Sequence, residues 1–295
     1  MSYSIGVDLG GTNIKAVAVT GSGQVLDHIT AATEDDDSTR WAGRVRELIN
    51  TLAGRRDEPP ACVGLASPGM VARDGRSIAA VHGQLERLAG LDWTTFLKTT
   101  APVLVLNDAH AALLGEVWQG AAVGCQDAVL LTLGTGGGGA ILAGGRLLKG
   151  HTGRGGHIGH ICLNIDGPPD AIGIPGSLEE AIGDRTLAAR SAGRFTSTER
   201  LVAAHLAGDE AATRVWLRSV YQLACAVASV INLLDPEVVI IGGGIARADR
   251  ALFDPLEEYL EHLEWRPDGH RVRLLPAALG DLAGALGAAY NAMRA

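Results

Sequence analysis

The chain has 295 residues, of which 47% are hydrophobic, enough for a buried core in one large domain or two domains of ordinary size. Its formal net charge of −8 and the absence of long Lys/Arg runs argue against nucleic acid as a partner. The N-terminus lacks a secretory pattern, and Asn232, Asp235 and Pro236 interrupt the longest apolar stretch. We therefore expect a cytoplasmic protein that does not span a membrane.

The first half of the chain alternates between strand and helix patterns. Three consecutive strands are expected over residues 3–33, with the second and third forming a hairpin around the Gly-Ser-Gly turn at 21–23. Apolar side chains at helical spacing predict a helix over 38–55, with Ser38 as a cap. The remaining elements are a strand at 61–66, a short helix at 92–100, a strand at 102–106 and a helix at 108–120.

The second half repeats this order of elements. Three strands are expected over 127–150, followed by helices and a late strand at 237–244. Two halves of the same order point to paired α/β domains. The last helix, 281–295, has an even pattern of small residues, and could pack on either domain.

The four cysteines lie in apolar sequence contexts without Cys-x-x-Cys spacing. This pattern predicts buried, reduced thiols. The residues concerned are Cys62, Cys125, Cys162 and Cys225.

A strand that ends at Asp8 and runs into Gly-Gly-Thr is the first motif with chemical meaning. Glycines let the backbone approach closely, so that successive N–H groups can bind phosphate oxygens. Asp8 could hold Mg²⁺ through water. The alternative is a plain hairpin turn. The candidate nucleotide-binding residues of this motif are Asp8, Gly10, Gly11, Thr12, Asn13 and Lys15.

Two later glycine runs follow strands in the second half. One comprises Gly134, Thr135, Gly136 and Gly137 and is a second candidate phosphate loop, although four glycines also suit a tight hairpin. The other comprises Gly242, Gly243 and Gly244 and could line a nucleoside or serve only as a strand-to-helix turn.

Asn107 and Asp108 directly follow the apolar strand at 102–106. Phosphoryl transfer to a hydroxyl needs a carboxylate that orients the acceptor and takes its proton. Asp108 is the candidate general base. The competing interpretation is that Asp108 caps the following helix, and it could do both.

These motifs, in this order, resemble the ROK family of sugar kinases and sugar-responsive repressors, and the resemblance covers nearly the whole chain. It implies two actin-like ATPase (ribonuclease H-like) α/β domains with an interdomain cleft. The expected boundaries are 1–118, 119–280 and a C-terminal helix at 281–295 that packs back on the N-terminal domain. The resemblance also implies ATP and Mg²⁺, a sugar substrate, a homodimer, Asp108 as base, and sugar contacts from Asn107 and from the loop containing Gly69.

The segment at 157–180 aligns with the family signature Glu-x-Gly-His and the cysteine cluster that follows it. The positions of the three family cysteines hold Asp170, Ile172 and Ser177, so no structural zinc is expected. A site from His157, His160 and Asp170 is the alternative. His160 and Glu179 match family sugar ligands.

His157 stands where the family has a Glu. A carboxylate only accepts hydrogen bonds, whereas imidazole can also donate. This difference indicates a shifted substrate preference, as does the loose match of residues 83–93 to another family segment.

We therefore expect an ATP-dependent sugar kinase, glucokinase-like by default. The alternatives are a catalytically weakened sugar sensor of the same family and a kinase that uses polyphosphate as donor.

Overall fold

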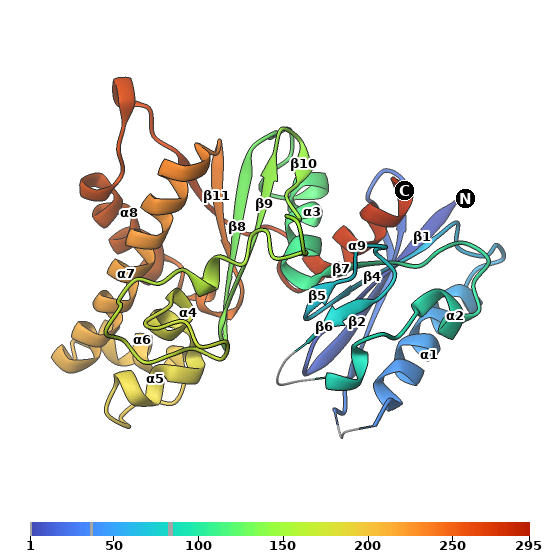
Figure 1. Cartoon of the computed structure of the whole chain (residues 1–295), viewed down its shortest axis with the longest axis horizontal. Coiled ribbons are helices and arrows are strands. Elements are labelled where there is room, and N and C mark those ends of the chain that lie inside the picture. Colours follow the sequence, from blue (N-terminus) through green and yellow to red (C-terminus); the bar gives the residue numbers. More distant parts are fainter. Residues whose placement is uncertain (1, 36–37, 82–84) are drawn as a thin grey trace. The chain divides into compact units, whose positions relative to one another are not determined.

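The computed structural model describes residues 2–35, 38–81 and 85–295, and these form two compact units. Unit 1 comprises Met1–Gly124, Leu147–Gly155 and Ala278–Ala295, and unit 2 comprises Cys125–Arg146 and Gly156–Ala277. Each unit contains its own five-stranded sheet (Figure 1). The segment Leu147–Gly155, which the expected boundary at 118 assigned to the second domain, packs within unit 1.

The expected strands and helices are present in the expected order, and the short strands β5, β6 and β12 occur in addition. The strands are β1 (Tyr3–Leu9), β2 (Asn13–Thr20), β3 (Val25–Ala32), β4 (Val63–Ser67), β5 (Met70–Val71), β6 (Ile78–Ala80), β7 (Leu104–Asn107), β8 (Ala128–Leu133), β9 (Gly137–Ala143), β10 (Arg146–Leu147), β11 (Val238–Gly242) and β12 (Arg273–Pro276). The helices are α1 (Arg40–Gly54), α2 (Trp93–Leu97), α3 (Asp108–Gln119), α4 (Leu178–Ile182), α5 (Asp184–Arg190), α6 (Thr198–Leu206), α7 (Glu210–Leu234), α8 (Arg250–Leu263) and α9 (Ala283–Met293).

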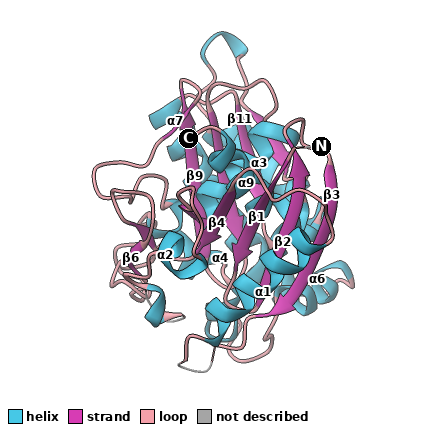
Figure 2. Ribbon diagram, turned by 90° about the vertical axis from the view of Figure 1, so that its right-hand side faces the viewer, coloured by secondary structure: helices cyan, strands magenta, loops and turns pink. Residues whose placement is uncertain are grey.

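The sheet of unit 1 has the strand order β3-β2-β1-β4-β7. Figure 2 shows β3, β2, β1 and β4 side by side. The β1–β2 and β2–β3 pairs are antiparallel, which confirms the expected hairpin, and β1, β4 and β7 are parallel. Successive residues of a strand face opposite sides of the sheet. Ile5, Val7 and Leu9 therefore join the core formed with α1, and Gly6 and Asp8 face α9.

Helix α9 packs on β1, β4 and α3 of unit 1. A side chain at Gly6 or Gly64 would collide with backbone carbonyls of α9, so glycine at these strand positions lets the helix approach closely. The residues 283–289 of α9, nearly all of them small, are buried. Helix α9 is therefore part of unit 1.

The sheet of unit 2 has the order β10-β9-β8-β11-β12, and α7 is its principal core helix. Asp209 caps α7 by accepting from the Ala212 N–H, and the helix ends at Asp235 in a left-handed conformation before Pro236. In the described part of the chain, only α7 is long and apolar enough to cross a membrane, but half of its apolar window is buried within the protein. A core helix passes the same test, so this feature is weak evidence for a membrane span.

The prediction of buried cysteines is wrong for three of the four residues. Cys125 is buried, Cys62 and Cys225 are partly exposed, and Cys162 is exposed in the loop before α4. Cys62 and Cys162 lie in loops, and Cys225 lies on a partly exposed side of α7, so apolar neighbours in the sequence do not by themselves bury these thiols.

Candidate active site

Three polar residues gather at the carboxyl edge of the parallel strands in unit 1. Asp8 lies near the end of β1, Ser67 ends β4 and Asn107 ends β7. The strand register pairs Asp8 with Ala66 and Ser67 with Asn107, so the three residues occupy neighbouring strand ends. In open α/β sheets, ligands bind beyond the carboxyl ends of the parallel strands. This edge is the candidate site of unit 1.

The Gly10–Thr12 turn connects β1 to β2 at the same edge. The Gly10 N–H donates to the Asn13 carbonyl at 3.0 Å, and the Thr33 hydroxyl donates to the Gly10 carbonyl at 2.6 Å. These bonds fix the turn while Thr12 and Asn13 remain exposed. A fixed turn with exposed backbone and hydroxyl donors is compatible with phosphate binding.

Asp8 lies in an environment that opposes its negative charge. Burial and the nearby Asp108 raise the pKa of Asp8 to about 7. Lys15, which pairs with Asp8 from strand β2, acts in the opposite direction and partly offsets this rise. The Lys15 Nζ lies 3.6 Å from a carboxylate oxygen of Asp281. A carboxylate held in this way gains most from a bound cation, which fits the proposed Mg²⁺ role.

Asn107 rather than Asp108 caps α3, which corrects the alternative interpretation of Asp108. Asn107 has extended backbone angles, and its Oδ1 accepts from the N–H groups of Ala109 and His110 at 3.1 and 3.4 Å. Its Nδ2 donates to the carbonyl of Gly69, a residue in a left-handed conformation. The contacts of Asn107 therefore fix the start of the helix and the loop that contains Gly69.

Asp108 is the first residue of α3, and its side chain reaches solvent. Its carboxylate accepts from the Ala109 N–H at 2.8 Å. Desolvation by the surrounding protein raises the pKa of Asp108, and the hydrogen bonds from Ala109 and Asn107 oppose that rise. Because the side chain keeps contact with water, the carboxylate is accessible to an acceptor hydroxyl.

The two glycine runs of unit 2 are neighbours, because β8 and β11 are parallel and pair Thr132 with Gly242. Gly243 has φ +85°, and a Cβ there would meet the backbone of Leu133. The loop that holds Gly134, Thr135 and Gly136 is tied to α5, since the N–H groups of Asp184 and Arg185 donate to the carbonyls of Gly134 and Thr135. Unit 2 therefore brings the two runs together at one sheet edge.

His160, Asp170 and Glu179 form a cluster beside the second glycine loop. One ligand atom from each of these residues lies within 4.8 Å of the others. The His160 Nδ1 is 2.8 Å from the Asp170 Oδ2, and the N–H of Gly137 donates to the Glu179 Oε2 at 3.4 Å. Both proposed sugar ligands of unit 2 thus converge.

Asp170 is a buried acceptor that also shapes its own loop. Its Oδ1 accepts from the N–H groups of Ile172 and Ile174 at 3.0 and 2.9 Å. Burial acts to raise the pKa of Asp170, but these bonds and that from His160 outweigh it, and the pKa is lowered. The loop is therefore fixed by a carboxylate as well as by packing.

The cluster could hold a metal by ligand type, but its donors are already engaged. Asp170 accepts from His160, and Glu179 accepts from the Arg185 guanidinium at 2.6 Å. Ile172, at a family cysteine position, is exposed and has no ligating atom. The absence of structural zinc stays a prediction, which metal analysis of the purified protein tests.

His157 lies just before the 3-10 turn Ile158–His160 and is partly buried. Its ring is nearly parallel to that of His160, with an interplanar angle of 14° and centroids 6.3 Å apart. The structure thus places the residue that replaces the family Glu next to a proposed sugar ligand.

Sequence reasoning missed several residues at these edges. Arg185 bridges Glu179 and Glu180, but it follows Glu179 by six residues across the break between α4 and α5, so helical spacing gives no signal. Among described residues, the buried Ser67 hydroxyl has no hydrogen-bond partner. The segment at 83–93 loosely matched a family segment; residues 83 and 84 lie outside the described part, and Leu85, Leu88 and Trp93 are core residues.

Comparison with known proteins identifies the family. The ROK family model matches residues 4–295. The chain belongs to the ROK family. A glucokinase from Halalkalibacterium halodurans is 33% identical over 98% of this chain and 94% of its own length. An N-acetylmannosamine kinase from Escherichia fergusonii is 31% identical, with 98% of each chain covered.

The fold of this ROK protein is also that of a solved relative. The structure of a ROK family glucokinase from Streptomyces griseus, in complex with glucose and AMPPNP, has a TM-score of 0.83 at 25% identity and covers 100% of both chains. The expected fold class, with actin-like ATPase α/β domains, is thereby confirmed.

Proposed function

We propose that this ROK protein is a sugar kinase that transfers the γ-phosphoryl group of ATP to a hydroxyl of a hexose or hexose derivative. The observation that carries this proposal is Asp108, an accessible carboxylate at the edge of the parallel strands that also holds Asp8. Family relatives named glucokinase and N-acetylmannosamine kinase support the substrate class.

Asp108 is the proposed general base. It accepts the proton of the sugar hydroxyl as that oxygen bonds to the γ-phosphorus, and the bond from the γ-phosphorus to ADP breaks. The proton then passes from Asp108 to water. In this proposal His160 and Glu179 hold the sugar, together with Asn107 and the loop at Gly69.

Bound Mg²⁺-ATP would supply the phosphoryl group and neutralise charge that develops during transfer. Asp8, Thr12, Asn13 and Lys15 would hold the metal and phosphates from unit 1. The backbone of residues 134–137 would contact phosphate from unit 2, and that of residues 242–244 would contact the nucleoside. By resemblance to glucokinases, the 6-hydroxyl of the sugar is the proposed phosphoryl acceptor.

The identity of the sugar depends on His157 in this proposal. Neutral imidazole can donate one hydrogen bond where the family carboxylate only accepts. Substrates with an acceptor group at that position, such as an N-acetyl carbonyl or an acidic group, therefore gain relative to plain hexoses. We also propose that the protein is a homodimer, on the basis of family resemblance, and that it is cytoplasmic, on the basis of the sequence pattern. We propose that it has no structural zinc, because Asp170, Ile172 and Ser177 replace the family cysteines and the carboxylates of the cluster are engaged.

A screen of acceptors and donors tests this proposal. Purified protein should consume ATP with at least one member of a panel of hexoses, N-acetylated amino sugars, acidic sugars and polyols. Phosphoryl transfer from polyphosphate but not from ATP would show that polyphosphate, not ATP, is the donor. Sugar binding without transfer from either donor would favour the alternative that the protein is a catalytically weakened sugar sensor.

Asp108→Asn tests the role of the base. This variant should lower kcat by about 10²–10⁴-fold, since it removes proton transfer while keeping a similar shape. Nucleotide affinity, measured by calorimetry, should stay within error of the original protein. Exchange of the exposed Asp166 for Asn is the control, and full turnover by Asp108→Asn would refute the assigned role.

A further inference from the structure

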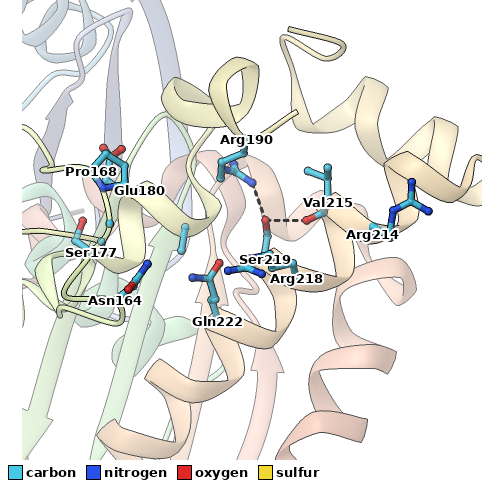
Figure 3. Close-up of a pocket in the computed structure, with 13 residues that line it drawn as sticks. Asn164, Pro168, Ser177, Glu180, Arg190, Arg214, Val215, Arg218, Ser219 and Gln222 are labelled. Carbon is cyan, nitrogen blue, oxygen red and sulfur yellow. Dashed lines mark hydrogen bonds between the residues drawn. The ribbon is translucent and has the colours of Figure 1, made fainter. Parts of the chain in front are cut away.

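A cavity of about 350 Å³ lies within unit 2, between the loop at 164–177, α4, α5 and α7 (Figure 3). Asn164 and Ser177 line one wall, and Arg190, Arg218 and Gln222 line the other. The cavity lining includes none of the glycines proposed to bind phosphate or nucleoside, and none of the residues proposed to bind the sugar. The volume falls in the range of small-molecule sites, roughly 300–1,000 Å³. The cavity is therefore separate from the proposed active site.

Arg190 places a fixed positive charge in the cavity wall. Its guanidinium donates to the Ser219 hydroxyl at 2.6 Å, the Gly183 carbonyl at 2.8 Å and the Thr186 hydroxyl at 3.2 Å. All of these acceptors are neutral, and no described carboxylate pairs with Arg190. Burial lowers its pKa to about 10, against the raising effects of Asp184 and Glu180, so the group stays charged at neutral pH.

Arg218 adds a second charge from α7. Its side chain is exposed at the cavity and, among the described residues, forms no hydrogen bond or ion pair. Arg214 lies one helical turn earlier and is farther out, with a loose pair to Glu210 at 3.7 Å (Figure 3). The single carboxylate of the wall, Glu180, is already bound to Arg185 at 3.0 Å. Three arginines and one carboxylate thus line the cavity, so its lining residues carry more positive than negative charge.

The polar groups around these arginines define the ligand chemistry. Guanidinium groups bind phosphate and carboxylate oxygens through paired hydrogen bonds, and two of them balance a dianion better than a monoanion. The amides of Asn164 and Gln222 can donate to and accept from hydroxyl groups. We infer that this cavity binds a small phosphate ester that carries hydroxyl groups, such as a sugar phosphate, with its phosphate between Arg190 and Arg218.

A ligand here would act on the proposed sugar site through α4. Arg185 binds Glu179, a proposed sugar ligand, and Glu180, a residue of the cavity wall. A phosphate near Glu180 repels its carboxylate and competes for the arginines around it, which alters the Arg185 bridge. This regulatory role rests on the proposed function, whereas binding in the cavity does not.

Calorimetric titration without nucleotide tests the binding. The probes are inorganic phosphate, a hexose 6-phosphate and the same hexose without phosphate. The hexose 6-phosphate should bind, and Arg218→Gln should weaken it by about tenfold, the value of one charge-assisted hydrogen bond. Because Arg218 is exposed, the Arg218→Gln variant should fold. Arg190→Lys keeps the positive charge but loses the paired hydrogen bonds of the guanidinium, and it should also weaken binding.

The control is Arg200→Gln, which removes an exposed arginine of α6 that does not line the cavity. Equal affinity in Arg218→Gln and Arg200→Gln, or no binding of either phosphate probe to the original protein, would overturn the site. Binding of inorganic phosphate as tightly as the ester would show that the hydroxyl groups are not recognised and overturn the ester as ligand. The regulatory role requires hexose affinity to change with the ester in the original protein but not in Arg218→Gln.

Discussion

His160 receives its orientation from Asp170, ten residues farther along the chain. With Nδ1–H directed at the carboxylate, the neutral imidazole presents Nε2 as an acceptor, which can receive a hydrogen bond from a sugar hydroxyl. Asp170 is thus a positioning residue that acts through His160. Asp170 occupies the first of the three family cysteine positions, so at this place in the chain a carboxylate that orients His160 replaces a thiolate.

Asp170→Asn should raise the KM for the sugar by about tenfold, the effect of one hydrogen bond of about 1.4 kcal/mol, with little change in the KM for ATP. The Asn amide presents a donor to Nδ1 and so favours the other tautomer. Asp166→Asn, in the same loop but exposed, is the matched control for steady-state kinetics. Equal sugar KM values in both variants would contradict the positioning role.

Asp170 also predicts how stability depends on pH. Its pKa is lowered in the folded chain, because the hydrogen bonds from His160 and the loop outweigh the effect of burial. Its stabilising contribution is therefore present above the unfolded carboxyl pKa of about 4, and is lost as the pH falls through the lower folded value. The difference in unfolding temperature between the original protein and Asp170→Asn should shrink between pH 6 and pH 3. A constant difference would refute this assignment.

At the scale of elements, the buried carboxylate of Glu116 joins α3 to the start of the C-terminal segment. Its two oxygens accept from the N–H groups of Ala121, Ala278 and Leu279 at 2.7, 3.1 and 2.9 Å. The side chain has no exposed surface. One carboxylate therefore satisfies donors from two segments that lie far apart in the sequence.

Glu116→Gln should lower the free energy of unfolding by about 2–4 kcal/mol, because it weakens charge-assisted bonds and turns an amide donor toward backbone donors. Chemical denaturation followed by tryptophan fluorescence measures the loss. Glu199→Gln on the exposed side of α6 should change stability by less than about 0.5 kcal/mol. A Glu116→Gln protein as stable as this control would mean that the three N–H groups find other acceptors.

At the scale of the whole molecule, unit 1 is assembled from three segments of the chain. Its last segment carries α9, which packs against the sheet and α3. Because the chain leaves unit 1, builds unit 2 and returns, unit 1 cannot complete its core until the last residues are available. Unit 2 contains no residue beyond Ala277.

A chain that ends at Ala277 should therefore lose the fold of unit 1 while unit 2 remains folded. Removal of α9 exposes the apolar face of the sheet, at a cost comparable with the whole stability of a domain, about 5–15 kcal/mol. Limited proteolysis with mass spectrometry should find early cleavage within residues 2–124. A chain that ends at Met293 is the control, and equal protease resistance of unit 1 in both chains would disprove the dependence.

The sequence by itself determined the elements whose signals are local. Alternation and apolar runs located the strands of both sheets except β12, which had not been expected. The motif at Asp8 and the pair Asn107–Asp108 fell at strand ends, because a buried strand that stops at polar residues must reach the sheet edge there. The order of these motifs was enough to predict the family. Their catalytic and binding roles remain proposals that the experiments above test.

The tertiary structure alone decided which distant groups meet. It assigned the α3 cap to Asn107, paired Asp170 with His160, and surrounded a cavity with arginines from α5 and α7. None of these contacts follows from periodicity, because each joins elements whose separation in the sequence carries no information about their distance in space. A carboxylate, a histidine or an arginine acquires its role from the groups that packing places around it.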